Sequence, residues 1–588
     1  MKKFSLLSSA IFTALSLSVC SATAGTYYIP HTINKFDPLN NYRLQAMTVT
    51  GLNNNGEMVG MIDEGDRGVL RPIHNPYAKA VYWKNYNEPS ILPLPAYEPP
   101  PGDLYDYQDA KTGTSVYDIN DDGTAVGKLF KFQGRWPTLP YLLRPRAVEW
   151  TQTGVNGAYE LQYNDNPDHW GKNATTINSQ GDIALSQSSF IHFDLKQANG
   201  TYTSKDVSSV VDGLHALWPE AINDNGMVSL SNRQNLSQGA IYRADGTMFS
   251  TSGSANGYDY GAVYRGINNN GDSAGTRVRD FGNGIVNTVC HYTNFDTGAF
   301  DYEFDARHLI PALPSYNPSS CYLYDVNSSG VAVGNMTGSI SNTLPSITVG
   351  FTVDRETGNL TDIKSRIQLS GDLTAEDFDS LHLRKINDHG AILGYNGESP
   401  LLEYDSGGNQ TGWRNGNHDD DVYYYFEPKE AEQTVDNSDD TYASQLWIPI
   451  ASSDLLIFIP SPEPHWQLES STIGAHNDDY MKAVQGDGAY KYFTWNLDVP
   501  IDATYSVKAK WLGDGINDQN AVYEIRNGNT LIGTITKDQT QSSTAANGDT
   551  FELLGSYSLS SSEKLTVTLS GSGQGNLIAD AIRIDLVD

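Results

Sequence analysis

The sequence predicts an all-β protein, in which a seven-bladed β-propeller is followed by a C-terminal antiparallel β-sandwich. Three observations support this fold class. The 588 residues include 35 Tyr and 54 Gly, a composition typical of strands joined by tight turns. A short phrase of strand, Asn-Gly turn and strand recurs seven times in the first 400 residues. From residue 465 onward, apolar and polar residues alternate as in half-buried strands.

The repeated phrase supplies the inner hairpin of each predicted blade. Its clearest copies are Gly51-Leu-Asn-Asn-Asn-Gly56-Glu-Met-Val-Gly60 and Asp118-Ile-Asn-Asp-Asp-Gly123-Thr-Ala-Val-Gly127. The other copies begin at Thr176, Ala221, Gly266, Asp325 and Lys385. Asn and Gly supply the positive φ that a tight turn needs. Successive turn glycines are 45 to 67 residues apart, so we interpret each copy as a fixed unit with variable loops.

Two further strands follow most hairpins and complete a four-stranded blade. Aromatic strands include Lys79–Trp83 and Arg146–Trp150, and fourth strands include Ser90–Leu94. The segment Thr26–Ile33 precedes the first hairpin, and we expect it to supply the outer strand of the last blade and close the ring. The propeller is therefore predicted over residues 25–413. A β-solenoid is the alternative, although its rungs would be shorter and more uniform.

The repeats resemble those of extracellular HAF-repeat proteins over residues 45 to 405. Those proteins carry the same Ile-Asn-x-x-Gly-x-x-Val-Gly pattern before an aromatic strand. The His-Ala-Phe of the family's name is replaced here by Lys79-Ala80-Val81 or Arg146-Ala147-Val148. The resemblance implies export and a repeat fold, and it implies no particular reaction.

The N-terminus has the pattern of a secretory signal peptide over residues 1–24. Lys2 and Lys3 precede an apolar stretch from residue 4 to 19, and Ala22 and Ala24 fit a cleavage site after Ala24. No later apolar run approaches the roughly 20 residues that span a bilayer. We therefore expect a bacterial protein that is extracellular or periplasmic, has no membrane span and is a monomer.

The net charge of −32 argues against a protein whose whole surface binds nucleic acid or anionic membrane, because repulsion opposes the encounter. A local basic site remains compatible with it. Cys290 and Cys321 follow the signal peptide, and in an oxidising compartment they predict one disulfide. The alternative is a metal site with His291 and His308. No cofactor is predicted otherwise. Structural calcium at Asp-rich turns such as 120–123, or structural zinc, stays open.

After a linker or embracing segment, residues 414–464, the chain is predicted to form a second module over residues 465–588. His465-Trp466, Asn477–Tyr480, Tyr505–Trp511 and Ile578–Arg583 resemble the golvesin and xanthan-lyase C-terminal domain. That resemblance implies a carbohydrate-binding module appended to a secreted enzyme. Trp495 and Trp511 lie inside alternating strands, and we expect them to be core residues of the sandwich.

The loops opposite the Asn-Gly turns are rich in His, Arg and aromatic residues. Loops on a rigid scaffold often carry function, and the mouth of a propeller is a natural pocket. Tyr260 and Arg277 flank the fifth hairpin and His169 and His192 the third, so these four are expected at one mouth as catalytic residues. The predicted substrate-binding residues are His74, Arg135, Trp136, Trp170, His215, Arg233 and Arg279. No metal is predicted there.

These residue types suit an anionic polysaccharide as the partner. Arg matches carboxylate and sulfate groups, and aromatic rings stack on sugars. An Arg that neutralises a uronate carboxylate, with His or Tyr as base and Tyr as acid, would allow β-elimination. The arrangement is similar to that of seven-bladed propeller ulvan lyases. We therefore predict a secreted polysaccharide lyase for a uronate-containing, ulvan-like polymer. The alternative function is that of a non-catalytic glycan-binding or adhesion protein. For His192, the alternative is that it is merely packed in a strand.

Overall fold

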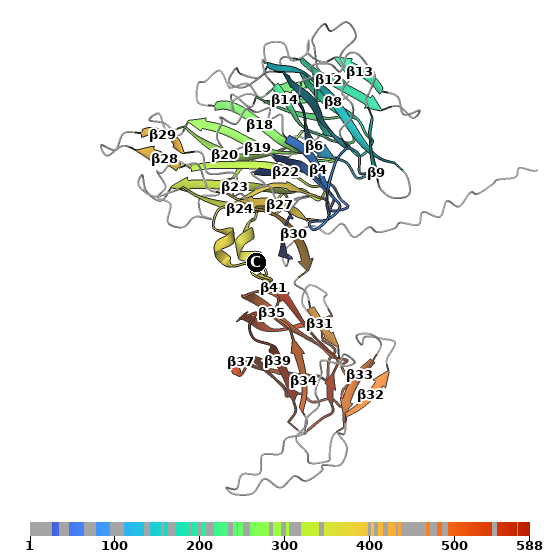
Figure 1. The fold of residues 1–588 in the computed structure, drawn as a ribbon. Coiled ribbons are helices and arrows are strands. Elements are labelled where there is room, and N and C mark those ends of the chain that lie inside the picture. Colours follow the sequence, from blue (N-terminus) through green and yellow to red (C-terminus); the bar gives the residue numbers. More distant parts are fainter. Residues whose placement is uncertain are drawn as a thin grey trace, which may run out of the picture.

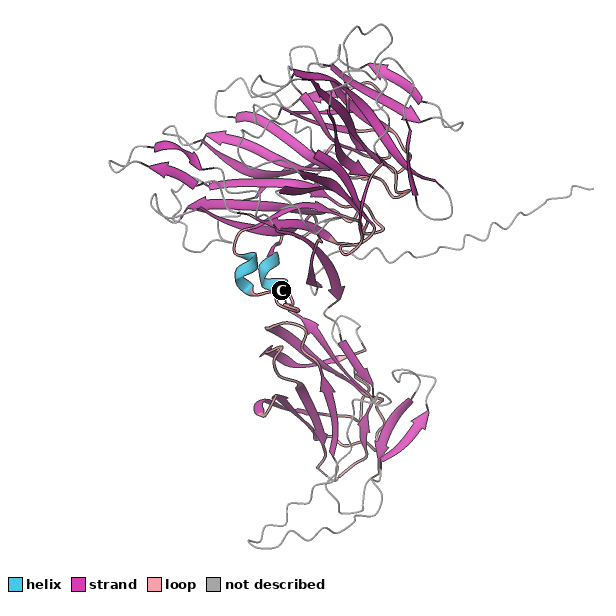
Figure 2. Ribbon diagram, in the orientation of Figure 1, coloured by secondary structure: helices cyan, strands magenta, loops and turns pink. Residues whose placement is uncertain are grey.

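The computed structural model shows an all-β chain, as the sequence predicts (Figures 1 and 2). It describes residues 26–34, 46–63, 78–93, 111–133, 141–153, 158–162, 172–187, 190–196, 202–206, 217–232, 239–243, 245–250, 259–280, 286–295, 301–304, 319–339, 346–397, 401–404, 410–414, 422–430, 433–436, 466–470, 479–484, 492–543, 550–572 and 574–587. The predicted signal peptide lies outside these residues. Within them, no helix is long and apolar enough to cross a bilayer.

Each of the first four repeats forms a sheet of four consecutive antiparallel strands. The first two sheets contain β2 (Ala46–Leu52), β3 (Met58–Asp63), β4 (Ala78–Trp83) and β5 (Pro89–Ile91), then β6 (Lys111–Ile119), β7 (Ala125–Gln133), β8 (Tyr141–Thr153) and β9 (Ala158–Gln162). The next two contain β10 (Asn173–Ile177), β11 (Ile183–Gln187), β12 (Phe190–Lys196) and β13 (Tyr202–Asp206), then β14 (Leu217–Ile222), β15 (Val228–Asn232), β16 (Gly239–Tyr242) and β17 (Met248–Ser250). The predicted aromatic strands are β4 and β8, and their Trp83 and Trp150 are fully buried.

The fifth and sixth repeats are joined into one eight-stranded sheet. It contains β18 (Asp259–Ile267), β19 (Asp272–Asp280), β20 (Val286–Asn294), β21 (Asp301–Phe304), β22 (Ser319–Val326), β23 (Val331–Ser339), β24 (Ser346–Asp354) and β25 (Leu360–Asp362). A parallel bridge from Thr288 to Ser320 links β20 to β22. A disulfide between Cys290 and Cys321 crosses the same two strands. This confirms the predicted disulfide, and the metal alternative is wrong because both sulfurs are bonded to each other.

The seventh repeat is completed by the N-terminal strand. Its sheet runs β26 (Leu381–Ile386), β27 (Ile392–Asn396), β30 (Val422–Glu430) and β1 (Thr26–Thr32), with β1 antiparallel to β30 at the outer edge. The predicted position of the N-terminal segment as the outer strand of the last sheet is thus confirmed. However, β30 lies in the segment predicted as a linker, so the seventh sheet extends past residue 413. The hairpin of β28 (Leu401–Tyr404) and β29 (Gln410–Arg414) precedes β30, and two short 3-10 helices, Ile363–Arg366 and Ala375–Phe378, precede β26.

A closed ring of hydrogen bonds joins the seven hairpins. The Asn that begins each turn is at most 6% exposed and donates from Nδ2 to the carbonyl of the equivalent Asn in the next repeat, over 2.7 to 3.2 Å. The seventh bond returns from Asn387 to Asn53, 334 residues earlier. The ring residues are Asn53, Asn120, Asn178, Asn223, Asn268, Asn327 and Asn387. We call this set the Asn ring.

Each ring Asn also stabilises its own turn. Asn223, for example, accepts at Oδ1 from the backbone N–H groups of Asn225 and Met227. The glycine that ends each of the seven turns has φ between 71° and 86°, a conformation that only glycine adopts at low cost. The recurring phrase in the sequence therefore encodes both the turn and the contact between repeats.

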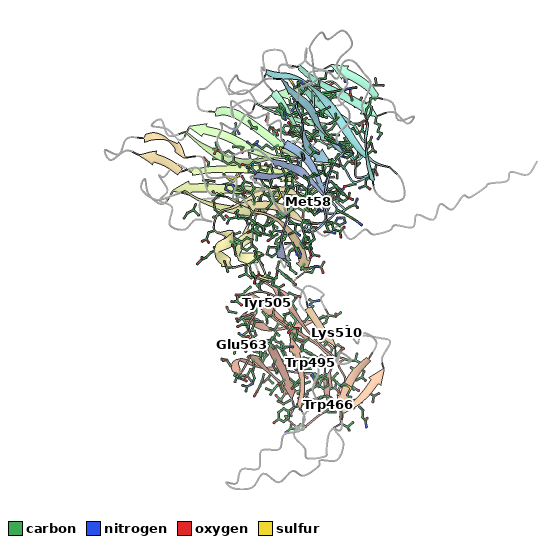
Figure 3. All side chains as sticks on the ribbon, viewed as in Figure 1. Met58, Trp466, Trp495, Tyr505, Lys510 and Glu563 are labelled. Carbon is green, nitrogen blue, oxygen red and sulfur yellow. A yellow bond between two sulfur atoms is a disulfide. The ribbon has the colours of Figure 1, made fainter. Side chains whose placement is uncertain are left out.

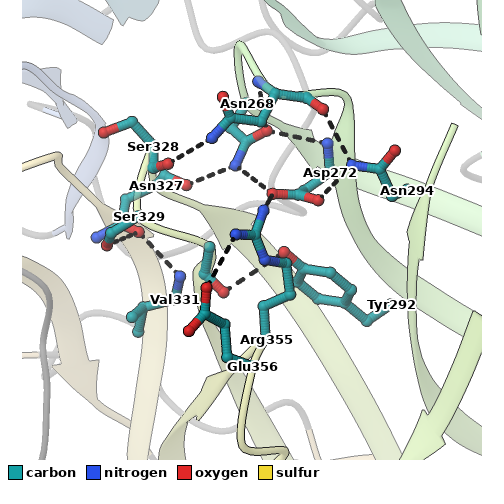
Figure 4. A network of polar contacts seen from close by, with 12 residues as sticks. Asn268, Asp272, Tyr292, Asn294, Asn327, Ser328, Ser329, Val331, Arg355 and Glu356 are labelled. Carbon is teal, nitrogen blue, oxygen red and sulfur yellow. Dashed lines mark hydrogen bonds and ion pairs between the residues drawn. The ribbon is translucent and has the colours of Figure 1, made fainter. Parts of the chain in front are cut away.

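The fifth and sixth repeats show how one ring bond is supported (Figure 4). Asn268 donates to the Asn327 carbonyl over 2.7 Å. Its neighbour Asp272 is fully buried and pairs with Arg355 of the sixth repeat over 2.8 Å. Asn294 donates to the same carboxylate over 2.6 Å. The buried charge is thus paired and hydrogen-bonded, as a buried carboxylate requires.

The C-terminal strands form a separate set of sheets (orange to red in Figure 1). One sheet contains β31 (Gln433–Asp436), β41 (Ala581–Leu586), β35 (Ala503–Lys510) and β38 (Glu552–Leu559); another contains β34 (Tyr492–Leu497), β39 (Leu565–Ser570), β36 (Ala521–Asn527) and β37 (Thr530–Lys537). A third contains β32 (Trp466–Ser470), β33 (Asp479–Ala483) and β40 (Leu577–Ala579). Strand β31 lies in the predicted linker, which therefore contributes to both sets of sheets.

The core of the C-terminal unit is built from alternating residues of its strands. Trp495, Tyr505 and Trp511 are at most 1% exposed, and Figure 3 shows Trp495 and Tyr505 within this unit. The prediction that Trp495 and Trp511 are core residues is confirmed. Tyr27 of β1 packs against the same cluster, so the N-terminal strand contacts both sets of sheets.

Candidate functional site

A cavity of about 720 Å³ is lined by the first strand of every repeat. Each of these seven strands has a β-bulge three residues before its ring Asn. A bulge leaves one residue out of the ladder and re-aims its side chain. All seven bulge residues line the cavity. They are Thr50, Tyr117, Thr175, Glu220, Arg265, Tyr324 and Arg384.

Two guanidinium groups lie over one tyrosine ring on the wall formed by the last three repeats. The Cζ atoms of Arg384 and Arg265 are 4.2 Å and 4.7 Å from the centroid of the Tyr324 ring. Arg384 also donates to the hydroxyl of Tyr395 on β27 over 2.8 Å. The buried Nε of Arg265 has no hydrogen-bond partner, which leaves an N–H donor unsatisfied beside the cavity. We call Arg265, Tyr324 and Arg384 the Arg-Tyr cluster.

The two arginines change the acidity of the Tyr324 phenol. Burial alone would raise its pKa, but the positive charges of Arg384 and Arg265 outweigh burial and hold the pKa below its ordinary value of 10. Burial works to lower the pKa of Arg384, whereas the neighbouring phenols of Tyr324 and Tyr395 raise it above its ordinary value. Arg384 is therefore a permanent cation, and the Tyr324 phenol loses its proton more readily than that of an ordinary tyrosine.

On the wall formed by earlier repeats, Tyr117 and Trp218 supply aromatic rings and Glu220 supplies a carboxylate. The rings of Trp218 and Tyr117 are in a T-shaped arrangement, with their centroids 6.3 Å apart. The ammonium of Lys128 lies 5.6 Å from the Tyr117 ring. Glu220 accepts a hydrogen bond from the Ser231 hydroxyl. This wall offers flat apolar surfaces suited to a sugar ring, while the Arg-Tyr cluster offers positive charge.

A charged layer lies between the bulge residues and the Asn ring. Asp118 accepts from the Thr176 hydroxyl over 2.7 Å and from the backbone of Ile177. Burial works to lower the pKa of Lys385, but the charges of Asp325 and Asp118 raise it above its ordinary value. Lys385 therefore remains charged among these carboxylates. We call Asp118, Asp325 and Lys385 the charged layer.

The structure describes only part of the predicted site. Seven of its residues lie outside the described part: His74, Arg135, Trp136, His169, Trp170, His215 and Arg233. Tyr260 and Arg279 lie on β18 and β19, at the ends far from the Asn ring. Arg277 is half-buried and its backbone pairs with Ala262. The loop placement of His192 is wrong: it lies within β12, where its backbone pairs with Leu185.

The Arg-Tyr cluster was missed, although its residue types match those predicted for the chemistry. The signal that locates it is the position three residues before the Asn of each aligned phrase. That position varies chemically from repeat to repeat, whereas the Asn and Gly do not. Among the described residues, no group of three or more His, Cys, Asp or Glu could hold a metal ion.

Comparison with known proteins supports the C-terminal prediction. The model of the Golvesin C-terminal domain family matches residues 461–586, so the predicted resemblance of this module is confirmed. A comparison with curated proteins gives no match. The resemblances of the repeats to HAF-repeat proteins and to ulvan lyases stay predictions.

The solved structures that are similar to this chain include carbohydrate-active enzymes at low identity. A xanthan lyase from Paenibacillus is 11% identical with a TM-score of 0.22, over 96% of this chain and 59% of that one. The chain thus spans less than two thirds of that enzyme. An exo-β-1,3-galactanase from Phanerochaete chrysosporium is 9% identical (TM-score 0.23; 95% and 100% covered). An arabinoxylan arabinofuranohydrolase from Bacillus subtilis is 11% identical (TM-score 0.21; 95% and 99% covered).

Proposed function

We propose that the seven repeats form a β-propeller and that its central cavity is the active site of a secreted polysaccharide lyase. The substrate is a uronate-containing polymer of the ulvan type, cleaved by β-elimination. The observation that carries this proposal is the Arg-Tyr cluster, in which two arginines lie over a tyrosine of lowered pKa. The closed Asn ring and the edge position of β1 support the propeller.

The chemistry follows from the charges in the cluster. A uronate carboxylate beside Arg265 and Arg384 has its charge neutralised, which makes the C5 proton more acidic and stabilises the enolate-like intermediate. The Tyr324 phenolate removes that proton, the C4–C5 double bond forms, and the C4–oxygen bond breaks. Tyr324 then returns the proton to the leaving oxygen. No external co-reactant is needed, and Tyr324 ends as the phenolate with which it began.

In our proposal, the residues predicted at the mouth of the propeller contact the parts of the polymer that lie outside the Arg-Tyr cluster. His169, His192, Tyr260 and Arg277, proposed as catalytic residues, contact the sugars next to the scissile bond. The proposed binding residues His74, Arg135, Trp136, Trp170, His215, Arg233 and Arg279 hold the chain outside the cavity. The C-terminal module binds carbohydrate and keeps the enzyme near its polymer.

The test is incubation with ulvan, alginate, pectin and glycosaminoglycans. Ultraviolet absorbance of the conjugated C=C–carboxylate product reports β-elimination, and reducing-end release reports any cleavage. We expect Tyr324→Phe to lower the rate by about 100-fold or more, the contribution of a positioned acid–base group. The matched control is Tyr322→Phe, a phenol two residues away on the same strand that does not line the cavity, and it should retain most of the activity.

The pH profile gives a second readout. Because the phenolate is the active form, the rate should rise as pH increases through the Tyr324 pKa, which lies below 10. Arg265→Gln removes one of the two charges that lower this pKa, so the rising limb should move to higher pH. Reducing ends without absorbance would indicate hydrolysis and contradict the lyase assignment. Binding without any cleavage would favour the non-catalytic glycan-binding protein.

A further inference from the structure

A second phenol lines the central cavity beside the Arg-Tyr cluster. Tyr395 lies on β27, the strand next to Arg384 of β26, and both side chains line the cavity. Arg384 donates from Nη2 to the Tyr395 hydroxyl oxygen over 2.8 Å. The Cζ atom of the same guanidinium is 4.2 Å from the centroid of the Tyr324 ring and 5.4 Å from that of the Tyr395 ring. Arg384 therefore contacts two phenols, of which the proposed reaction uses only Tyr324.

The Tyr395 ring is held in place by aromatic neighbours on both sides. It stacks on His382, with ring centroids 4.8 Å apart and an angle of 9° between the planes, and on Tyr423, at 5.2 Å and 29°. The three residues are aligned across adjacent strands, since the backbone of Tyr395 pairs with His382 on β26 and with Tyr423 on β30. A ring fixed in this way presents its hydroxyl at a defined position, so little freedom is lost when a ligand binds there.

The hydroxyl proton of Tyr395 is available to a ligand. A phenol both donates and accepts, whereas a guanidinium only donates, so the bond from Arg384 uses the Tyr395 oxygen and leaves its O–H group. Among the residues that the structure describes, none accepts this O–H. Tyr395 is half-buried and lines the cavity, where a ligand can supply the acceptor.

The donors around this hydroxyl suit a negatively charged acceptor with two oxygens. Arg384 has five N–H donors, and those that do not face Tyr395 and Tyr324 remain for a ligand. Across the Tyr324 ring, the buried Nε of Arg265 has no hydrogen-bond partner. A carboxylate can accept from a guanidinium with one oxygen and from a phenol with the other, and such charge-assisted bonds are the strong ones.

We infer that Tyr395 is a further catalytic residue, which donates its O–H in a hydrogen bond to the uronate carboxylate while Arg384 neutralises that carboxylate. The inference rests on the proposed function and adds a residue in direct contact with the substrate. As the C5 proton leaves, negative charge builds up on the carboxylate oxygens, so a fixed donor there stabilises the enolate-like intermediate. Because Arg384 contacts both rings, a carboxylate bound in this way lies next to Tyr324, the proposed base.

The first experiment measures binding without cleavage, with the full chain carrying Tyr324→Phe. The probes are short oligosaccharides made from ulvan by mild acid, and the same oligosaccharides after reduction of their carboxylates to primary alcohols. Adding Tyr395→Phe keeps the ring stack and removes only the hydroxyl. It should weaken binding of the carboxylated probe by about tenfold or more, the contribution of a hydrogen bond to a charged group, and leave binding of the reduced probe unchanged.

The matched control is Tyr322→Phe on the same background. Tyr322 also lies beside a guanidinium, with the Cζ atom of Arg265 5.9 Å from its ring centroid, but it does not line the cavity, so neither probe should lose affinity. Equal loss of both probes on Tyr395→Phe, or no loss, would overturn the inference. If wild type still cleaves a polymer by β-elimination, the proposed function survives that result. Absence of both cleavage and binding would remove the proposed function together with the inference.

The second experiment separates direct contact from an effect that Tyr395 exerts through Arg384. If Tyr395 only positioned Arg384, Tyr395→Phe would weaken the effect of that charge on Tyr324, raise the Tyr324 pKa and move the rising limb of the pH–rate profile to higher pH. Direct contact predicts a rate lower by about 100-fold, as for loss of one donor to a developing oxyanion, with the rising limb unmoved. A shifted limb would overturn the direct contact.

Discussion

The Asn ring makes a quantitative prediction about stability. Asn223 is 3% exposed and makes three hydrogen bonds: one from Nδ2 to the Asn268 carbonyl over 2.8 Å, and two at Oδ1 from the N–H groups of Met227 (2.8 Å) and Asn225 (3.1 Å). A typical hydrogen bond contributes about 1 kcal/mol, and a buried N–H left unsatisfied costs about 1–3 kcal/mol. Asn223→Ala should therefore lower the free energy of unfolding of the repeat region by about 3–5 kcal/mol.

The matched control lies two residues further along the same turn. Asn225→Ala removes one exposed hydrogen bond, from Nδ2 to the Asn269 carbonyl, and should cost about 1 kcal/mol or less. Urea unfolding monitored by tryptophan fluorescence measures both variants, and the transition of the C-terminal unit serves as an internal reference that should not move. Equal effects of Asn223→Ala and Asn225→Ala would refute the idea that the buried ring holds the repeats together.

Two further predictions concern cross-links between strands. Reduction of the Cys290–Cys321 disulfide, which closes a 31-residue segment, should lower the free energy of unfolding by about 3–4 kcal/mol on the loop-entropy relation; an unchanged unfolding midpoint in thermal melts with reductant would contradict this. Partial burial works to raise the pKa of Glu427, but the hydrogen bonds and charges of Lys429 and His31 outweigh burial, so the pKa lies below its ordinary value. Because the folded pKa is depressed, this carboxylate stabilises the protein above the pKa of the unfolded chain, near 4.5, and the contribution is lost as pH falls through the folded value. Acid melts should thus show Glu427→Gln less stable than wild type at neutral pH and converging with it in acid; a difference that does not vary with pH would rule out this account.

The fold could be predicted to a large extent because its determinants are local. The Asn and Gly of each phrase dictate a turn, and the alternation of residues around Trp495 dictates a strand with one buried face. The strand at residues 422–430 was missed although Val422–Phe426 is a run of β-branched and aromatic residues. The hairpin of β28 and β29 separates it from β27, and its other partner, β1, lies at the N-terminus, so its place in the last sheet is not a local property.

The site was harder to predict because the direction of its side chains depends on a bulge. The register shift between Leu323 and Asp325 leaves Tyr324 out of the ladder of β22 and β23, where it lines the cavity, and such a shift cannot be located from the sequence. The chemistry of the cluster also comes from three consecutive repeats: Arg265, Tyr324 and Arg384 follow one another at intervals of about 60 residues and meet only when the fifth, sixth and seventh repeats pack side by side.

The position of β1 at the outer edge of the last sheet has a consequence for the kinetics of folding. His31 bonds to Glu427, 396 residues later in the chain, so this pairing demands one of the largest loop closures available to the molecule. Contacts between distant residues form slowly, and until then the edge of β30 offers unpaired backbone groups to other chains. Closure of the last sheet should therefore be the slow step of folding. Until it is complete, the protein should be most prone to aggregation.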